Sequence, residues 1–344
     1  MFLSLFNHGS VPFYWKTLEP EQGNIRFEKD SKFIYRRPPP DAVVEFCQKH
    51  NIYPKGHPIV WDNQQWAYPD WLPDDEGKIW ELMERHVEKL AERYGKTIPM
   101  WDVVNELSRR HEHMTKPYDF GFRSFEKAAS VFPPETHLII NDVTAVWNDL
   151  KREYSSYYLI IENMLLKGAK IDGIGLQCHL WTAQILRDFL EDPRDIFKVM
   201  DTYAYFGKPL HITEITIPTI NTPDGQDIQA KATETLYRIW FSHPNMESIV
   251  WWNMVDNTAA PGQDSSLGGL LDENMQPKKS YHVLNRLINE EWKTRMDART
   301  NNNGQTGYRG FYGDYIITVG TGRKATKHVI KVLKGKENEF VIRL

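Results

Sequence analysis

Two glutamates, Glu106 and Glu214, each follow a short apolar stretch of the chain. A carboxylate in such a place is costly unless it is paired or used. Two carboxylates that meet at one site can hydrolyse a glycosidic bond. One then protonates the leaving oxygen, and the other acts as a nucleophile or as a base for water. The other interpretation is that each glutamate starts a helix, where the helix dipole favours a negative charge.

Polar and aromatic side chains also stand in or at the end of other apolar stretches. A histidine or amide there can bind a sugar hydroxyl, and a tryptophan can form the floor of a sugar site. The candidates are His57, Trp61, Gln177, His179 and one of the pair Trp251 and Trp252. Each is equally compatible with a packed core, so the residues alone leave both interpretations open.

A metal or disulfide role is not favoured by the remaining chemistry-bearing residues. The run His111-Glu112-His113 does not have the H-E-x-x-H spacing of a helical zinc site, and no third ligand is evident. The two cysteines, Cys47 and Cys178, are too few for a disulfide framework, and both are expected to be buried free thiols.

Expected strands and helices alternate along the first 295 residues, as in parallel βαβ units, and these elements must position the candidate residues. Strands are expected at Phe2–Phe6, Tyr53–Val60, Pro99–Val104, His137–Asn141, Asp172–Gln177, Pro209–Thr213 and Ser248–Trp252. Helices are expected at Asp41–His50, Gly77–Tyr94, Phe122–Val131, Leu150–Lys167, Asp195–Phe206, Ile228–His243 and Lys279–Glu291. The pattern predicts an α/β fold of the TIM-barrel type, with one unit fewer than eight and with catalytic groups at the C-terminal ends of the strands.

The pattern changes near residue 298. A polar, turn-rich segment, Asn301–Gly307, precedes three β-rich runs at Tyr308–Val319, Lys327–Leu333 and Phe340–Leu344. Residues 1–297 are therefore expected to form the barrel, and residues 298–344 a linker and a small antiparallel β appendage.

The amino-acid composition excludes some classes of protein and some kinds of binding partner. The 344 residues are 41% hydrophobic and 13% aromatic, which excludes a disordered chain. No apolar run is long enough for a membrane helix. The net charge of −4 comes without any basic block, so nucleic acid is not an expected partner. The N-terminus lacks the basic region and cleavage site of a signal peptide.

The chain resembles glycoside hydrolase family 10, the retaining endo-β-1,4-xylanase family. The resemblance runs in order from about Phe6 to Ile288. It is carried by Glu19–Gly23 (E-P-x-x-G), Gly56–Trp61 (G-H-x-x-x-W), Trp101–Glu106, Asn141–Asp142, Asp172–Leu180, Ile212–Ile215 and Leu271–Lys278.

The resemblance implies a role for each matching residue. Glu106 would be the general acid/base and Glu214 the nucleophile, about 5–5.5 Å apart, as retention requires. Asn105 would bind the sugar 2-hydroxyl, and His179 would hold Glu214 ionised. The resemblance places His57, Trp61, Gln177 and Trp252 around the sugar next to the scissile bond. No cofactor and no metal are implied.

Three departures from the family pattern bear on the fold and on the substrate. The chain begins at what would be the family's second strand, so the first βα unit of the barrel is expected to be missing. The family's E-N-E-M-K-W run is replaced by Ser10–Trp15, with Tyr14 where the sugar-binding lysine would stand. A lost charged partner costs about 1.5–3 kcal/mol, so sugar binding there should weaken or change preference. The loop Asp256–Gly262 also lacks a tryptophan often seen there.

The expected function is retaining hydrolysis of β-1,4-glycosidic bonds in plant cell-wall polysaccharide, foremost as an endo-β-1,4-xylanase acting by double displacement. One alternative is the same mechanism on a decorated xylan or a plant glycoside. The other is a carbohydrate-binding or inactive fragment. The expected partner is a xylan-type polysaccharide, with neither nucleic acid nor membrane. A monomer is expected. The resemblance implies a secreted or periplasmic protein, although no signal peptide is visible in this sequence.

Overall fold

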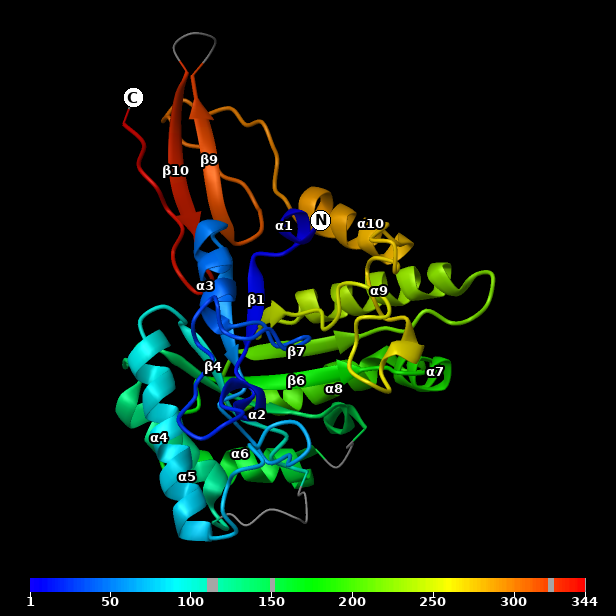
Figure 1. Cartoon of the computed structure of the whole chain (residues 1–344). Coiled ribbons are helices and arrows are strands. Elements are labelled where there is room, and N and C mark those ends of the chain that lie inside the picture. The colour runs from blue at the N-terminus through cyan, green and yellow to red at the C-terminus, as the bar shows by residue number, and fades with distance from the viewer. Residues whose placement is uncertain (110–116, 149–151, 321–324, 344) are drawn as a thin grey trace. The chain divides into compact units, whose positions relative to one another are not determined.

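The computed structural model describes residues 1–109, 117–148, 152–320 and 325–343. These residues form two compact units, Met1–His282 and Val283–Leu344. The first unit holds the parallel sheet and most of the helices, and the second holds an antiparallel hairpin (Figure 1).

The strands of the first unit all run parallel. They are β1 (His8–Pro12), β2 (Tyr53–His57), β3 (Val60–Trp61), β4 (Met100–Asn105), β5 (His137–Asp142), β6 (Gly173–His179), β7 (Leu210–Thr216) and β8 (Met246–Ile249). Their order in the sheet is β1-β2-β4-β5-β6-β7-β8, and β3 pairs with β4 beyond the end of β2. The sheet is a nearly closed barrel of the predicted TIM type. Among the described residues, its two edge strands β1 and β8 do not pair with each other.

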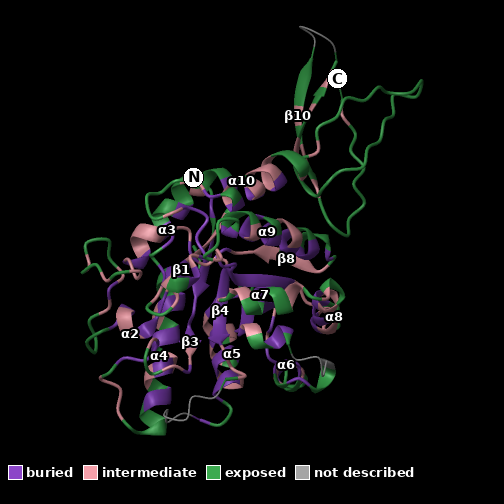
Figure 2. Ribbon diagram, turned by 90° about the vertical axis from the view of Figure 1, so that its right-hand side faces the viewer, coloured by how far each residue is buried: buried purple, intermediate pink, exposed green. Residues whose placement is uncertain are grey.

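Helices link successive strands and lie outside the sheet (Figure 2). The helices of eight residues or more are α3 (Pro40–Lys49), α4 (Glu76–Tyr94), α5 (Phe120–Val131), α6 (Ser156–Leu166), α7 (Ala183–Leu190), α8 (Pro193–Ala204), α9 (Gly225–Ser242) and α10 (Lys279–Arg286). Shorter ones are α1 (Phe2–Leu5), α2 (Trp15–Leu18), the 3₁₀ turns Thr144–Trp147, Arg152–Tyr154 and Asp264–Ser266, and the π turn Leu287–Glu291. Helix α4 is amphipathic, with Trp80, Met83, Val87 and Leu90 on its buried face, as 3.6-residue periodicity predicts, whereas α6 also exposes Leu159 and Leu166.

The most completely buried strands of the barrel are β4, β5, β6 and β7, whose residues are almost all buried. Trp101 of β4 lies flat against Gly56 of β2, and a Cβ added at Gly56 would stand 2.2 Å from the indole ring. Only glycine fits at that place, so this pair fixes how closely the strands that carry His57 and Glu106 approach each other.

The predicted first strand, Phe2–Phe6, is wrong. Residues Phe2–Leu5 form the short helix α1, and the strand follows at His8–Pro12. The ring of Phe6, which caps this helix, lies 5.4 Å from the Phe2 ring. A short apolar run cannot be assigned to helix or strand by periodicity. The true strand was hidden by its glycine and proline, which are poor strand formers.

The last strand and the appendage also differ from expectation. Strand β8 ends at Ile249, before the predicted end at Trp252, because it is an edge strand with β7 as its partner on one side. The second unit contains β9 (Gly313–Val319) and β10 (Thr326–Val332), paired antiparallel from Gly313↔Val332 to Val319↔Thr326. The third run, Phe340–Leu344, is not a strand over its described residues.

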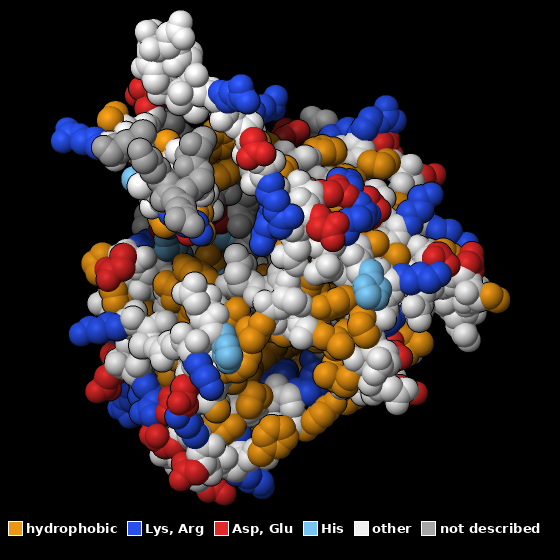
Figure 3. Space-filling view, turned by 90° about the horizontal axis from the view of Figure 1, so that it is seen from above, with side chains coloured by type: hydrophobic (Ala, Val, Ile, Leu, Met, Phe, Trp, Pro, Cys, Tyr) orange, Lys and Arg blue, Asp and Glu red, His pale blue; other side chains and the backbone are white. Residues whose placement is uncertain are grey.

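Basic and acidic side chains are interspersed on the face shown in Figure 3. In the described part of the chain, no helix is both long and apolar enough to span a membrane. Both cysteines are buried free thiols, as predicted.

Candidate active site

Glu106 sits directly after β4 in an unusual backbone conformation. Its φ is 57°, in the left-handed region that costs a non-glycine residue free energy. The Glu106 N–H donates to the Asn141 carbonyl at 2.8 Å, which fastens it to the end of β5. Such strain is typical of functional sites, where the surrounding structure compensates for it.

Glu214 lies inside β7 and is buried among hydrogen-bond donors. Its Oε1 accepts from Asn141 Nδ2 at 3.2 Å and from Gln177 Nε2 at 3.2 Å. Its Oε2 lies 3.2 Å from His179 Nε2. The Thr216 hydroxyl lies 2.9 Å from His179 Nδ1 and can donate a hydrogen bond to it. With Nδ1 as the acceptor, the proton of a neutral His179 is on Nε2, which can then donate to Glu214.

Gln177 brings the two carboxylates together. Its Nε2 lies 3.3 Å from Glu106 Oε1 and 3.2 Å from Glu214 Oε1, so the sum of the two, 6.5 Å, is the greatest separation of these oxygens. The two catalytic carboxyl groups are roughly 6.5–9.5 Å apart in inverting glycosidases and roughly 5–5.5 Å apart in retaining ones. A separation of at most 6.5 Å therefore allows the retaining distance and reaches only the shortest inverting distance.

The surroundings push the two carboxyl pKa values apart. Burial, followed by the negative charge of Glu214, raises the pKa of Glu106 to about 7. Burial alone would raise the pKa of Glu214 as well. The hydrogen bond from His179 and the nearby His57 outweigh burial there and lower this pKa below its ordinary value. Near neutral pH one carboxyl can therefore hold a proton while the other is ionised, which suits an acid and a nucleophile.

His57 is held by a buried ion pair on the other side of Glu214. Its Nδ1 lies 2.6 Å from Asp102 Oδ2, and its Nε2 lies 3.6 Å from Glu214 Oε1. Lys55 Nζ donates to the same Asp102 oxygen at 2.6 Å. Burial would raise the pKa of Asp102, but Lys55 and His57 lower it to about 2. Asp102 thus fixes the orientation of the His57 ring through Nδ1, the nitrogen on the side away from Glu214.

We expect Asp102→Asn to destabilise the fold by about 3–5 kcal/mol at pH 7, because it leaves the buried Lys55 without its counter-ion. The folded pKa of about 2 lies below the unfolded value of about 3.9. The stabilisation from Asp102 is therefore complete above pH 4 and is lost as pH falls toward 2. Urea unfolding at several pH values measures this.

The control for this variant is Glu81→Gln, which removes an exposed ion pair with Arg85 on α4. Its effect should stay below about 1 kcal/mol. Equal effects of the two substitutions at pH 7 would contradict the importance of the Lys55–Asp102–His57 group.

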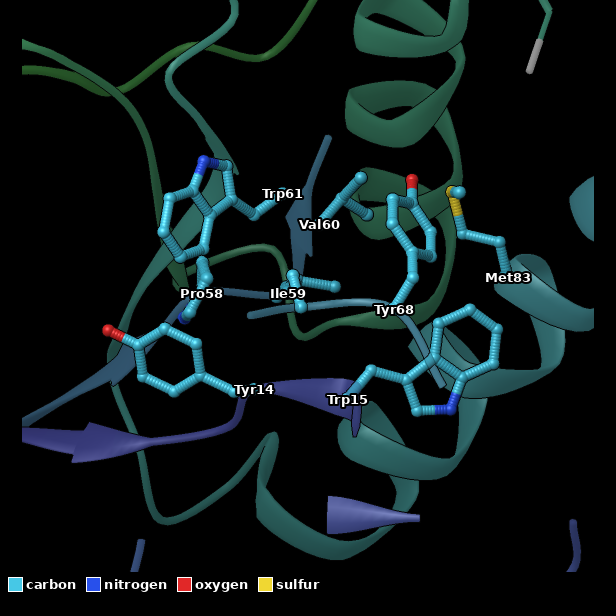
Figure 4. Close-up of a pocket in the computed structure, with 9 residues that line it drawn as sticks. Tyr14, Trp15, Pro58, Ile59, Val60, Trp61, Tyr68 and Met83 are labelled. Atoms are coloured by element: carbon cyan, nitrogen blue, oxygen red, sulfur yellow. The ribbon is translucent and has the colours of Figure 1, made fainter. Parts of the chain in front are cut away.

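Aromatic side chains surround this polar group. The Tyr14 hydroxyl lies 3.1 Å from His57 Nε2, and its ring meets Trp61 edge-on at 5.9 Å. The Trp61 Nε1 is buried and has no acceptor among the described residues. Figure 4 shows Tyr14 and Trp61 on one side of a small apolar pocket and Trp15, Tyr68 and Met83 on the other.

Trp252 and Asn105 complete the set of predicted residues. Trp252 lies beyond the end of β8, with its ring edge-on to His57 at 6.0 Å and to His179 at 5.8 Å. Asn105 Oδ1 accepts from Asn141 at 2.8 Å and from Gln177 at 3.3 Å. All the predicted site residues are therefore linked by contacts around Glu214.

Asn141 and Asp102 were not predicted as site residues. Both end or lie in strands whose other residues are apolar, the same signal that marked Glu106 and Glu214. The run 111–113 lies outside the described residues. Among those described, no group of three or more His, Cys, Asp or Glu side chains is arranged to hold a metal.

A family model described as glycosyl hydrolase family 10 matches residues 13–286, most of the chain. The chain belongs to glycosyl hydrolase family 10. The resemblance inferred from the motifs is thereby confirmed, and the nearly closed barrel agrees with it.

The individual proteins to which the chain is similar share less than 30% sequence identity with it. Endo-1,4-beta-xylanase B of Thermotoga neapolitana is 29% identical over 300 residues, which cover 82% of this chain and 80% of that protein. Anti-sigma-I factor RsgI6 of Acetivibrio thermocellus is 28% identical over 313 residues and 89% of this chain, but this chain spans only 36% of that protein. Native xylanase 10B from Thermotoga maritima has a TM-score of 0.65 at 22% identity, covering 82% of this chain and 87% of that one, and shows the shared fold.

Proposed function

We propose that the chain hydrolyses β-1,4-glycosidic bonds of xylan-type polysaccharide with retention of configuration, as an endo-β-1,4-xylanase. The observation that carries this is the placement of Glu106 and Glu214 on one Gln177 nitrogen, with their pKa values moved in opposite directions. The endo-1,4-beta-xylanase among the relatives supports the choice of substrate.

In the first step, Glu214 attacks the anomeric carbon while protonated Glu106 gives its proton to the leaving oxygen. This forms a glycosyl ester on Glu214 and releases the aglycone half of the chain. In the second step, ionised Glu106 takes a proton from water, which attacks the same carbon and displaces Glu214. Two inversions give net retention. Formation of the ester removes the Glu214 charge, so the pKa of Glu106 falls and it becomes a base when one is needed.

The remaining site residues would bind and orient the sugar at this carbon. Asn105 and Gln177 can donate to its hydroxyls, and the unpaired Trp61 Nε1 is a further donor. Tyr14, His57 and Trp252 would form the wall beside it, and His179 would keep Glu214 ionised. We assign this catalytic role to residues 1–297 and treat 298–344 as an appendage. We further propose that the protein is a monomer that acts outside the cytoplasm on its polysaccharide, without nucleic acid or membrane partners.

A second candidate is the same mechanism on a decorated xylan or a plant glycoside. It is favoured by Tyr14, which lies under the Arg37 guanidinium at 3.7 Å from its ring centroid. This wall of the site differs from the pattern expected for plain xylan.

The test is the release of reducing sugar from unbranched β-1,4-xylan by the wild type beside Glu106→Ala and Glu214→Ala. Release by the wild type alone is the expected result. If xylan is not hydrolysed while an aryl β-xyloside is cleaved, the glycone site is intact and unbranched xylan is not the substrate. If a folded wild-type sample cleaves neither, the carbohydrate-binding or inactive alternative takes the place of this proposal.

A further inference from the structure

The segment 32–37 carries two exposed aromatic rings and two half-buried arginines close to the site. Phe33 and Tyr35 are 67% and 62% exposed, and Arg36 and Arg37 follow directly. The Arg37 N–H donates to the Ile34 carbonyl at 2.8 Å, and Arg36 at the tip of this turn has a φ of 62°. Aromatic surfaces with a few placed polar groups are typical of ligand sites.

The segment is fixed in place rather than loose, because buried Arg26 fastens it from beneath. Arg26 donates from Nε to the Lys32 carbonyl at 2.8 Å and from Nη2 to the Arg37 carbonyl at 3.2 Å. Its Nη1 donates to the Thr17 carbonyl at 2.6 Å, in the segment that follows β1 and Tyr14. Both ends of 32–37 are therefore tied to the wall that carries Tyr14, so its side chains are positioned before any ligand binds.

Both arginines reach the wall of the active site. Arg37 covers the face of Tyr14, whose hydroxyl contacts His57, and His57 in turn contacts Glu214. Arg36 donates from Nη1 to the Thr258 carbonyl at 2.9 Å and from Nη2 to Asn253 Oδ1 at 3.1 Å. Asn253 is the neighbour of Trp252, so the pair spans from β1 to the segment after β8.

The negative charge of Asp264 acts on Arg36, but it raises the Arg36 pKa less than burial and the Arg37 charge lower it. Neither guanidinium forms an ion pair with an Asp or Glu in the described part of the protein, and the Arg37 side chain donates to one protein acceptor, the Arg36 carbonyl at 2.9 Å. A guanidinium has five N–H donors, so most of those of Arg37 remain available. Burial and the neighbouring Arg37 charge lower the pKa of Arg36, as expected for two like charges held close together.

We infer that Arg36 and Arg37 form a carboxylate-binding subsite, which takes an acidic sugar unit, such as a uronic acid, next to the sugar that Glu214 attacks. The inference rests on the proposed function for the identity of the main chain of the substrate. The planar guanidinium fork binds a carboxylate with two parallel hydrogen bonds, and Tyr35 and Phe33 offer surfaces for the adjoining rings. The subsite narrows the substrate class to acidic, branched xylan.

The experiment compares three ligands of one length: a xylo-oligosaccharide with a glucuronic acid branch, the same molecule with that carboxyl reduced to an alcohol, and the unbranched chain. Calorimetric titration into the Glu214→Gln variant measures binding without turnover. We expect the acidic ligand to bind about ten- to a hundredfold more tightly than its reduced form. We expect Arg37→Gln, and more fully the Arg36→Gln/Arg37→Gln pair, to remove the difference. Added salt should reduce it.

The matched control is Arg85→Gln, an exposed arginine on α4, which should keep the full preference for the acidic ligand. Equal affinities for the acidic and reduced ligands, or a preference that survives the double substitution, would overturn the inference. Hydrolysis of xylan by the intact protein is scored separately. Hydrolysis without acid preference defeats this inference alone, and acid preference without hydrolysis supports it while defeating the proposed catalytic function.

Discussion

Replacing Glu214 by alanine is expected to lower kcat on xylan by at least about a hundredfold, since the ester intermediate then has no nucleophile. The side chain is buried and accepts three hydrogen bonds, so its position is set before the substrate binds. The measurement is kcat on an aryl β-xyloside and on xylan, with the unfolding temperature of each variant recorded beside it. Azide should restore turnover in Glu214→Ala and give the inverted glycosyl azide, because a small anion can attack from the vacated space.

The matched control is Glu191→Ala, an exposed glutamate between α7 and α8. It should leave kcat within about twofold, as surface substitutions away from a site usually do little. A folded Glu214→Ala variant that retains full activity would eliminate Glu214 as the nucleophile. Loss of activity without azide rescue, in a protein that unfolds at a lower temperature, would indicate a structural role only.

The second large effect concerns pH. With the pKa of Glu106 at about 7, its acid form is present below pH 7, so kcat/KM should fall about tenfold for each pH unit above that value. The pKa of Glu214 is lowered, so it stays ionised into the acid range, and the acid limb of the profile should lie below the ordinary carboxyl value. A bell with its alkaline limb near pH 7 is the expected profile.

The identity of the alkaline limb is tested with Glu106→Gln on an aryl β-xyloside whose leaving group needs no proton. The limb should disappear in this variant. In Glu214→Gln, the pKa of Glu106 measured by carbon NMR should fall, because the charge that helps to raise it has gone. An alkaline limb that survives in Glu106→Gln would assign the general acid elsewhere.

Much of this site could be predicted from the sequence because it follows strand ends. Asn105 and Gln177 lie on strands that the apolar runs mark clearly, and Glu106 directly follows one of them. Parallel strands of a barrel bring their C-terminal ends together. The family motifs then named the roles of the two glutamates. Six of the seven expected parallel strands and the antiparallel hairpin of the appendage are present. The strand expected at Phe2–Phe6 is a helix followed by a strand at His8–Pro12, and the third appendage run is not a strand over its described residues.

The contacts that tune the site could not be predicted from one sequence. Asp102 matters because Lys55 and His57 of the neighbouring strand meet it, and such a pairing depends on register. Arg36 and Arg37 lie in a loop without periodicity, and only the turn and the anchoring Arg26 bring them to Tyr14. Loop residues of this kind carry specificity while leaving no signal in hydrophobic patterning.

The central claim is that Glu106 and Glu214 act together in a double displacement, and the configuration of the first product tests it most directly. Proton NMR of a xylo-oligosaccharide, recorded during the first minutes of hydrolysis, distinguishes the anomers of the newly formed reducing end before they equilibrate. The close approach of the two carboxylates at Gln177 predicts that the β-anomer appears first. Initial release of the α-anomer would mean single displacement by water and would contradict the mechanism proposed for this site.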